Sequence, residues 1–217
     1  MKTTHYVIIT LIGIVLSNTS YAQKPLVENK NPIVIIDPGH GGIDAGAVAI
    51  NNTKEKDIVL RIASKMLVLN QTVLNNSLNL YITRYTDTLV SLGDRTQLAK
   101  KLKADIFISI HCNQAINRTA AGTEVYIHPK SEVQAEESAY LGFTVQKGLA
   151  DLLGIKNRGI KYGNFQVLRE NHNDTTSILL ELGFLSQTDE AIYLSNEKSQ
   201  YAIALVILQS IIKFLEL

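Results

Sequence analysis

The chain has 217 residues, of which 46% are hydrophobic and 19% are charged, and its formal net charge is +1. This composition is typical of a globular protein and argues against a disordered chain. A nearly neutral chain also lacks the basic excess that binds nucleic acid, so we expect no nucleic-acid partner. Cys112 is the only cysteine, which excludes an intramolecular disulfide.

The amino terminus has the pattern of a secretory signal peptide. Lys2 precedes an apolar run from Tyr6 to Leu16, and Ser20-Tyr21-Ala22 provides a small-residue cleavage site. An uncleaved anchor is the alternative, but the run is shorter than the roughly 20 apolar residues that span a bilayer. We therefore predict a signal peptide over residues 1–22, no membrane span after its removal, and an exported protein that acts in a periplasm or at an extracellular cell wall.

After a short polar leader at residues 23–32, strand-like and helix-like segments alternate to the carboxyl terminus. The expected strands lie at about 33–37, 78–83, 105–111, 122–127 and 177–182, and the expected helices at about 53–70, 93–103, 134–153 and 197–215. This alternation predicts a single α/β domain over residues 33–217, with a mixed, mostly parallel sheet and helices on both faces. The last helix is apolar nearly all round, so we expect it to be largely buried.

The first expected strand ends in the sequence Asp37-Pro38-Gly39-His40-Gly41-Gly42. Strands of parallel or mixed sheets present functional groups at their carboxyl ends, so His40 is placed to meet a ligand. We expect the glycines to relieve the steric limits on the turn and to keep side chains out of a substrate's way. A dinucleotide-binding loop is a weak alternative, because Asp44 takes the place of the third glycine of G-x-G-x-x-G and no helix follows at once.

Glu55 begins a helix whose apolar residues recur at helical spacing. It lies three and four positions before the first two of them, so it shares the stripe that faces the core: Ile58, Val59, Ile62, Ala63 and Met66. The alternative is structural, because Asn52 and Glu55 have the spacing of a capping box. Glu55 alone does not decide between a cap and a ligand.

A second histidine, His111, ends the apolar strand at residues 104–110. A single such histidine is more often a hydrogen-bonded core residue, but two at strand ends favour a metal site. Strand alternation points Cys112 to the opposite face, where we expect a small buried hydrophobe. His128 and His172 stand in polar sequence, so we expect both at the surface, with His172 as a weak candidate for the rim of the site.

Glu181 lies inside the apolar segment Ser177–Phe184, which is typical of a strand that is buried on both faces. Leaving an ionised group unpaired in the interior costs roughly several kcal/mol, so carboxylates are seldom fully buried without a partner. The alternative is a strand that emerges into solvent near Gly183. We take Glu181 as the strongest acid/base candidate.

Two imidazoles and one carboxylate suit a catalytic Zn²⁺, which keeps a fourth position for water. His40, Glu55 and His111 supply that set for one Zn²⁺, which would polarise a carbonyl and lower the pKa of its water, as amide hydrolysis requires. Glu181 would then move the protons, which is worth about 10²- to 10⁴-fold in rate. The chain has neither an HExxH motif nor a G-x-S-x-G elbow. The spacing alone does not bring the four side chains together.

The motifs from Ile33 to the carboxyl terminus resemble, in order and spacing, those of the zinc-dependent N-acetylmuramoyl-L-alanine amidases. The matching segments are Ile35–Gly42, Glu55–Asp57, Thr83-Arg84, Leu92–Arg95, Asp105–His111, Gly122–Tyr126, Asn157–Lys161 and Leu180–Ser186.

This resemblance implies a six-stranded sheet, zinc held by His40, Glu55 and His111, and Glu181 at the position of the catalytic glutamate. It also implies the substrate, which is the amide between the lactyl group of N-acetylmuramic acid and L-alanine in peptidoglycan, cut in septum cleavage or wall turnover. A zinc peptidase that acts on the stem peptides is the nearest alternative. A non-catalytic wall-binding protein is another, although it would be expected to lack one of these four residues.

Family members that wait for an activator carry a long helical insertion after the strand that matches Gly122–Tyr126. Here the segment from His128 to Ser131 leads directly into the next expected helix. We therefore expect a monomer that is active without a blocking helix, so that an activator protein is possible but not required.

Overall fold

The computed structural model describes residues 31–129 and 134–216, so the expected signal peptide and most of the polar leader lie outside the described residues. Its centre is a six-stranded sheet in the order β2-β1-β3-β6-β4-β5. Every neighbouring pair is parallel except β4 and β6, which are antiparallel. The strands are β1 (Ile33–Pro38), β2 (Asn79–Ile82), β3 (Ile106–Asn113), β4 (Thr123–Ile127), β5 (Asn157–Tyr162) and β6 (Thr176–Phe184).

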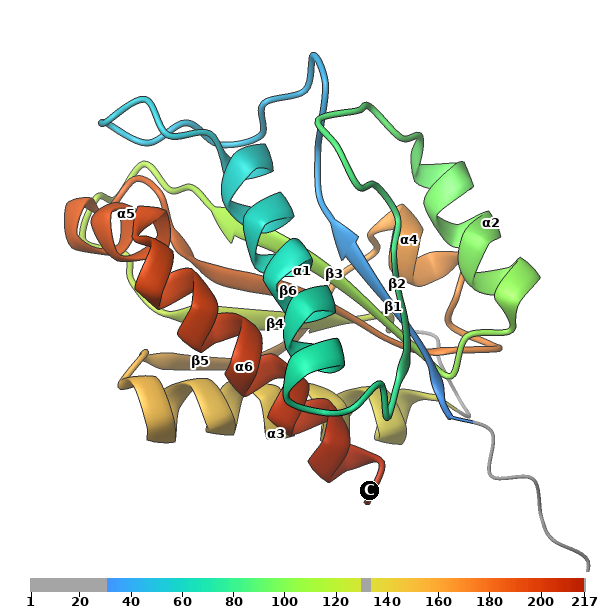
Figure 1. Cartoon of the computed structure of the whole chain (residues 1–217). Helices are drawn as coiled ribbons and strands as arrows, with labels where there is room; N and C mark the ends of the chain where they lie inside the picture. Colours follow the sequence, from blue (N-terminus) through green and yellow to red (C-terminus); the bar gives the residue numbers. More distant parts are fainter. Residues whose placement is uncertain (1–30, 130–133, 217) are drawn as a thin grey trace, which may run out of the picture. The chain divides into compact units, whose positions relative to one another are not determined.

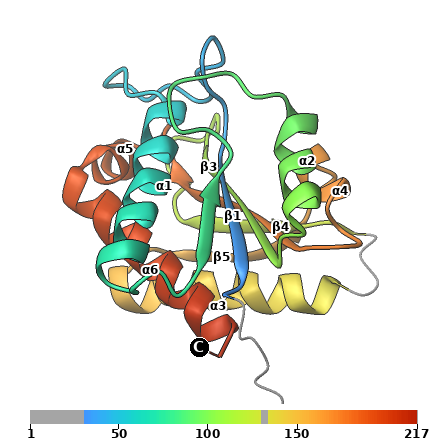
Figure 2. The same cartoon turned by 45° about the vertical axis from the view of Figure 1, so that its right-hand side comes forward.

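Helices lie on both faces of this sheet, as the alternating sequence predicts (Figures 1 and 2). On one face α1 and α3 both pack against α6, and α3 also covers β4, β5 and β6. On the other face α2 packs against α4, and this pair covers parts of β1 and β6. The helices are α1 (Glu55–Thr72), α2 (Leu92–Leu102), α3 (Ala135–Leu153), α4 (Gln166–Arg169), α5 (Thr188–Ser195) and α6 (Glu197–Phe214).

The side chains of each strand alternate between two hydrophobic clusters, one on each face. In β1, Val34 and Ile36 belong to the large cluster beneath α1 and α6, whereas Ile35 belongs to a small cluster beneath α2 and α4. In β3, Phe107 contacts the small cluster and its neighbours Ile106 and Ile108 the large one. We call the face with the large cluster the sealed face and the other the open face.

The expected strands and long helices all form, with ends shifted by a few residues at most. Three short elements were not predicted from the sequence: β5, α4 and α5. β5 is an edge strand with no buried residue, so its sequence Asn-Arg-Gly-Ile-Lys-Tyr carries no apolar pattern to detect. As expected, α6 is largely buried, with eight buried residues between Gln200 and Ile211. No helix in the described part of the chain is long and apolar enough to cross a membrane.

Candidate active site

Polar side chains replace apolar ones at one end of the open face. Asp37 and Ser109 lie opposite each other in the register of β1 and β3. His111 of β3 then lies opposite Glu181 of β6, and Glu181 lies opposite Glu124 of β4. Directly opposed residues share a face of the sheet, and so do Ser109 and His111, which are two residues apart in β3. These side chains therefore lie in two adjacent rows on the open face, and we call the whole group the polar row.

The structure brings together three of the side chains that the sequence singled out. One nitrogen each of His40 and His111 and one oxygen of Glu55 all lie within 4.8 Å of one another. Glu55 Oε1 lies 3.1 Å from His40 Nε2 and 2.9 Å from His111 Nδ1. In the part of the chain that the structure describes, no other three His, Cys, Asp or Glu residues gather in this way.

The helix start places the Glu55 carboxylate between the two rings. Glu55 is the first residue of α1 after Lys54, and no side chain caps the helix, so the capping-box alternative is wrong. Its Oε1 accepts a hydrogen bond from the Cys112 backbone N–H at 2.9 Å, and its Oε2 accepts one from the Ala47 N–H at 2.8 Å. Burial would raise the pKa of Glu55, but the hydrogen bonds from the two imidazoles outweigh it and lower the pKa to about 2.

His40 is held by its neighbours in a backbone conformation that few side chains adopt, with φ at 59°. Asp44 Oδ2 lies 2.8 Å from its Nδ1, which turns Nε2 toward Glu55. Such a carboxylate behind a ligating imidazole is common at metal sites, where it fixes the ring. Burial would lower the pKa of His40, but hydrogen bonds and charges from Glu55 and Asp44 raise it to about 9.

The glycines around His40 make room for the protein's own groups. A Cβ on Gly39 would overlap the His111 ring, and one on Gly41 would overlap the Thr88 carbonyl oxygen. A Cβ on Gly42 would lie 2.9 Å from the Leu89 backbone nitrogen. These glycines are therefore required by the fold itself, and the expectation that they also keep side chains out of a substrate's way stays a prediction.

Two buried arginines hold the turn that carries His40. Arg84 donates to the carbonyls of Pro38 and Gly39 at 3.0 and 2.9 Å, and Arg95 donates to those of Pro38 and His40, both at 2.8 Å. Arg95 also pairs at 2.6 Å with Asp37, which is 1% exposed. Buried carbonyls need hydrogen-bond donors, and the two guanidinium groups provide them and hold the turn in place.

Sequence reasoning quoted these arginines within motifs but gave them no role. A signal was present for Arg95, which lies in the buried stripe of α2 with Thr96 and Ala99. A charged residue in such a stripe is seldom buried without a partner.

Glu181 lies beside this group on the neighbouring strand, opposite His111. The residue is half-buried rather than buried as expected, in contrast to its neighbours in β6. Its Oε2 is buried and has no hydrogen-bond partner. Burial raises the pKa of Glu181 to about 7; the charges of Glu55 and Glu124 also raise it, while those of His111 and His40 oppose this shift. A carboxyl with this pKa can accept and return a proton near neutral pH.

A cavity of about 710 Å³ opens next to these residues on the open face. Its walls include His40, His111 and Glu181, together with the apolar side chains of Leu89, Val90, Leu92, Phe165, Val167 and Leu179. A cavity with apolar walls and a few converging polar groups is the usual form of a ligand site.

Of the histidines that the structure describes, His128 and His172 lie away from the metal donors. His128 is buried rather than at the surface, and its ring lies 4.6 Å from that of His172. Both belong to the opposite end of the sheet from Glu181, because His128 follows the carboxyl end of the antiparallel β4. His172 is therefore not at the rim of the site.

The donor set fits a metal ion with nitrogen and oxygen ligands. Two imidazoles and one carboxylate match the three-ligand sites in which Zn²⁺ acts catalytically. Their proximity, the hydrogen bond between Asp44 and His40, and the space that Gly39 leaves for the His111 ring all favour this use. Glu181 lies beside these donors, opposite His111 in the register of β3 and β6.

Comparisons with known proteins show the family of the chain. A family model described as N-acetylmuramoyl-L-alanine amidase matches residues 34–213. The chain is 32% identical to the uncharacterized protein YqiI of Bacillus subtilis, over 92% of this chain and 91% of that protein. It is 34% identical to the N-acetylmuramoyl-L-alanine amidase LytC of the same organism, over 82% of this chain but 35% of the longer LytC.

Solved structures of the same family share the fold of this chain. The crystal structure of an N-acetylmuramoyl-L-alanine amidase from Clostridium difficile 630 superposes with a TM-score of 0.78 at 36% identity, covering 85% of this chain and 97% of that one.

Proposed function

Because the chain belongs to the N-acetylmuramoyl-L-alanine amidase family, we propose that it hydrolyses the amide between the lactyl group of N-acetylmuramic acid and L-alanine in peptidoglycan. The observation that carries this proposal is the convergence of three metal donors beside Glu181, whose Oε2 is buried and has no hydrogen-bond partner. Such a set performs hydrolysis of an amide at neutral pH. The proposal includes roles in septum cleavage or wall turnover.

His40, Glu55 and His111 would hold one Zn²⁺. When bound, Zn²⁺ supplies a Lewis acid that polarises the amide carbonyl and lowers the pKa of water. Asp44 keeps the His40 ring turned toward the other donors, and the Cys112 and Ala47 N–H groups hold the Glu55 carboxylate. Arg84 and Arg95 position the His40 turn through its carbonyls.

Glu181 would act as the general base and then as the general acid. As a carboxylate it takes the proton of the attacking water, and as a carboxylic acid it gives that proton to the amine nitrogen as the carbon–nitrogen bond breaks. Its pKa of about 7 balances the two tasks. The burial of its Oε2 supports this role, because competing water has little access to that atom.

We also propose that the protein is exported and that it works without an activator. Residues 1–22 would be a signal peptide and residues 33–217 the catalytic domain of an exported monomer, in a periplasm or at an extracellular wall. Only residues 128–134 separate β4 from α3. A connection of this length leaves little room for a blocking helix, which supports activity without an activator.

Product analysis tests the function directly. Purified, zinc-loaded protein is incubated with peptidoglycan, and the products are identified by mass spectrometry. Intact stem peptides with a free L-alanine amine, together with glycan strands without stems, are expected. Cleavage inside the stems would instead identify a peptidase, and no cleavage at all would support a non-catalytic wall-binding protein.

The same digest tests independence from a partner. We expect hydrolysis by the pure protein alone. If pure, zinc-loaded protein is inactive and a wall-associated partner restores hydrolysis, the expectation of activity without an activator is wrong.

A further inference from the structure

We propose that Arg158 and Lys161 form a subsite that binds a carboxylate of the stem peptide, on the side of the leaving amine. This inference rests on the proposed amidase function and adds to it a basis for substrate selection. It concerns β4 and β5, whose residues the metal site and Glu181 do not use.

The subsite is organised by Glu124, a carboxylate that is 3% exposed. Its Oε1 accepts from Arg158 Nε at 2.7 Å and from Lys161 Nζ at 2.5 Å. Its Oε2 accepts from the Tyr126 hydroxyl at 2.9 Å and from Asn113 Nδ2 at 3.2 Å. Burial would raise the pKa of Glu124, but these hydrogen bonds, led by that of Lys161, lower it, so Glu124 carries its charge at neutral pH.

The cluster has two cations for one carboxylate, which leaves one positive charge. The Arg158 and Lys161 side chains are 30% and 39% exposed, whereas that of Glu124 is 4% exposed. The positive groups therefore reach solvent while the negative group stays beneath them. A lysine ammonium has three donors and binds Glu124 through only part of them, so donors remain for an anionic ligand.

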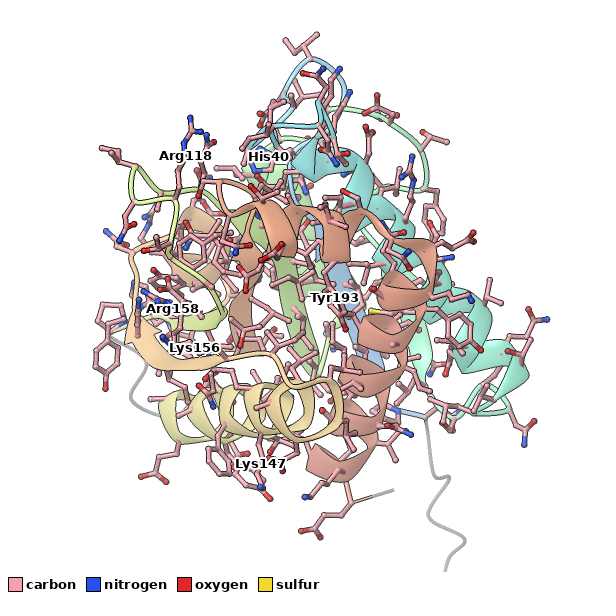
Figure 3. The ribbon with its side chains drawn as sticks, turned by 90° about the vertical axis from the view of Figure 1, so that its left-hand side faces the viewer. His40, Arg118, Lys147, Lys156, Arg158 and Tyr193 are labelled. Carbon is pink, nitrogen blue, oxygen red and sulfur yellow. The ribbon has the colours of Figure 1, made fainter. Side chains whose placement is uncertain are left out.

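Arg158 is also held in place before any ligand arrives. Its guanidinium carbon lies 5.1 Å from the centre of the Phe184 ring, and its Nη1 donates to the Ala121 carbonyl at 3.3 Å. Stacking and hydrogen bonds of this kind reduce the entropy that a side chain loses when it binds. Figure 3 shows Arg158 on the same side of the molecule as the turn of His40, below it in that view.

The order of the strands places this cluster on the leaving-amine side. The metal donors belong to the ends of β1 and β3 and the start of α1, Glu181 belongs to β6, and Glu124 and Lys161 follow on β4 and β5. The carbonyl carbon is attacked at the metal donors, and the amine nitrogen receives its proton from Glu181. The peptide that begins at this nitrogen consequently continues over β4 and β5.

The distances agree with a carboxylate near the start of the stem. Neighbouring strands lie about 4.8 Å apart, so cations that bind Glu124 lie roughly 5–10 Å beyond Glu181. An extended peptide advances about 3.4 Å per residue, so this interval is covered within the first two or three residues. A carboxylate on the residue after L-alanine falls in this range. The glycan part, whose lactyl carboxyl is consumed in the amide, offers no such charge.

Two matched substrates test the subsite. Both are muramoyl peptides with the same stem, one with a free carboxylate on the residue after L-alanine and the other with a carboxamide there. For zinc-loaded wild-type protein we expect kcat/KM to favour the carboxylate by about tenfold, which corresponds to about 1.4 kcal/mol. In Lys161→Met this preference is expected to fall to about twofold or less, and Lys161→Arg is expected to restore most of it.

Binding of the released peptides provides a readout other than turnover. Calorimetry on zinc-loaded protein is expected to give the same tenfold preference, which Lys161→Met removes. Lys156→Met is the matched control, because it removes an exposed cation from the same edge outside the Glu124 cluster. This control is expected to keep the preference.

The outcomes separate the two proposals. If wild-type protein cleaves neither substrate at the lactyl amide, the proposed function fails. If it cleaves both equally well, or if Lys161→Met keeps the full preference in both measurements, the subsite is wrong and the amidase function stands. Equal losses for both substrates in Lys161→Met would assign Lys161 to the support of Glu124 and would likewise overturn the subsite.

Discussion

The two faces of the sheet differ although the same strands build them. On the sealed face, β3 contributes Ile106, Ile108, Ile110 and Cys112 to one continuous apolar cluster. On the open face, the same strand begins with the apolar Phe107 and then presents Ser109 and His111. One strand thus supplies the core on one side and the site on the other, since successive side chains point to opposite faces.

This comparison shows where polar groups are tolerated. The sealed face is covered by α1, α3 and α6, so any polar group there would need a partner inside the core. On the open face, α2 and α4 cover only parts of β1 and β6. Within the polar row, His111 and Glu181 lie beyond this cover, next to the cavity. The buried members Asp37, Ser109 and Glu124 instead have polar partners inside the protein.

Neighbouring residues on opposite faces provide the sharpest test of this division. We expect His111→Ala to lose stoichiometric zinc and all detectable turnover, because it removes one of three donors. Cys112→Ala is the control on the sealed face; it should keep zinc and turnover and lose about 1 kcal/mol of unfolding free energy through a small cavity. Metal analysis after dialysis, turnover and urea unfolding measure the three quantities. If Cys112→Ala loses zinc while His111→Ala keeps all of it, the assignment of the metal site to the open face is wrong.

The buried ion pair of the open face is expected to matter for stability as well. Arg95→Met leaves Asp37 charged and nearly unexposed without its partner, which should lower the free energy of unfolding by about 3–5 kcal/mol. The carbonyls of the His40 turn also lose donors, so zinc affinity should fall. Lys101→Met, on the exposed side of the same helix, should change stability by no more than about 0.5 kcal/mol. An equally small change in Arg95→Met would show that the pair does not hold the turn.

The effect of Glu124 should depend on pH. Its pKa in the folded protein is lowered, so its charge contributes stability above the ordinary glutamate pKa and loses this contribution as pH falls through the folded value. Glu124→Gln should cost about 1–3 kcal/mol at pH 7, and the difference from wild type should shrink below about pH 4.5.

Urea unfolding between pH 7 and pH 3 measures this effect. Glu197→Gln is the control, because that side chain is 87% exposed and should show almost no effect at any pH. A cost for Glu124→Gln that grows toward low pH would have the wrong sign.

Much of the fold could be predicted because apolar periodicity marks buried segments. The strands β1, β3 and β6 and the helix α6 carry long apolar runs, and all were found. β5 was missed because an edge strand with half-buried polar residues has no such run. α4 was missed because four residues are too few to show a helical period.

The metal donors were predictable because they interrupt apolar patterns, a histidine at a strand end or a glutamate in a core-facing stripe. The residues that hold these donors in place could not be predicted, because Asp44 and Arg84 look like ordinary polar residues in loops. Only the folded chain brings Arg84 to carbonyls that lie 45 and 46 residues earlier in the sequence. For the same reason, the sequence did not reveal that Gly39 makes room for the His111 ring.

The zinc content and turnover of Glu181→Gln, measured on the same preparation, test the proposed roles most directly. His40, Glu55 and His111 are proposed to bind the metal and Glu181 to transfer the proton. We expect one zinc per chain, as in the wild type, with turnover of peptidoglycan reduced about 10²- to 10⁴-fold. Full turnover, or loss of the zinc, would contradict this division of roles.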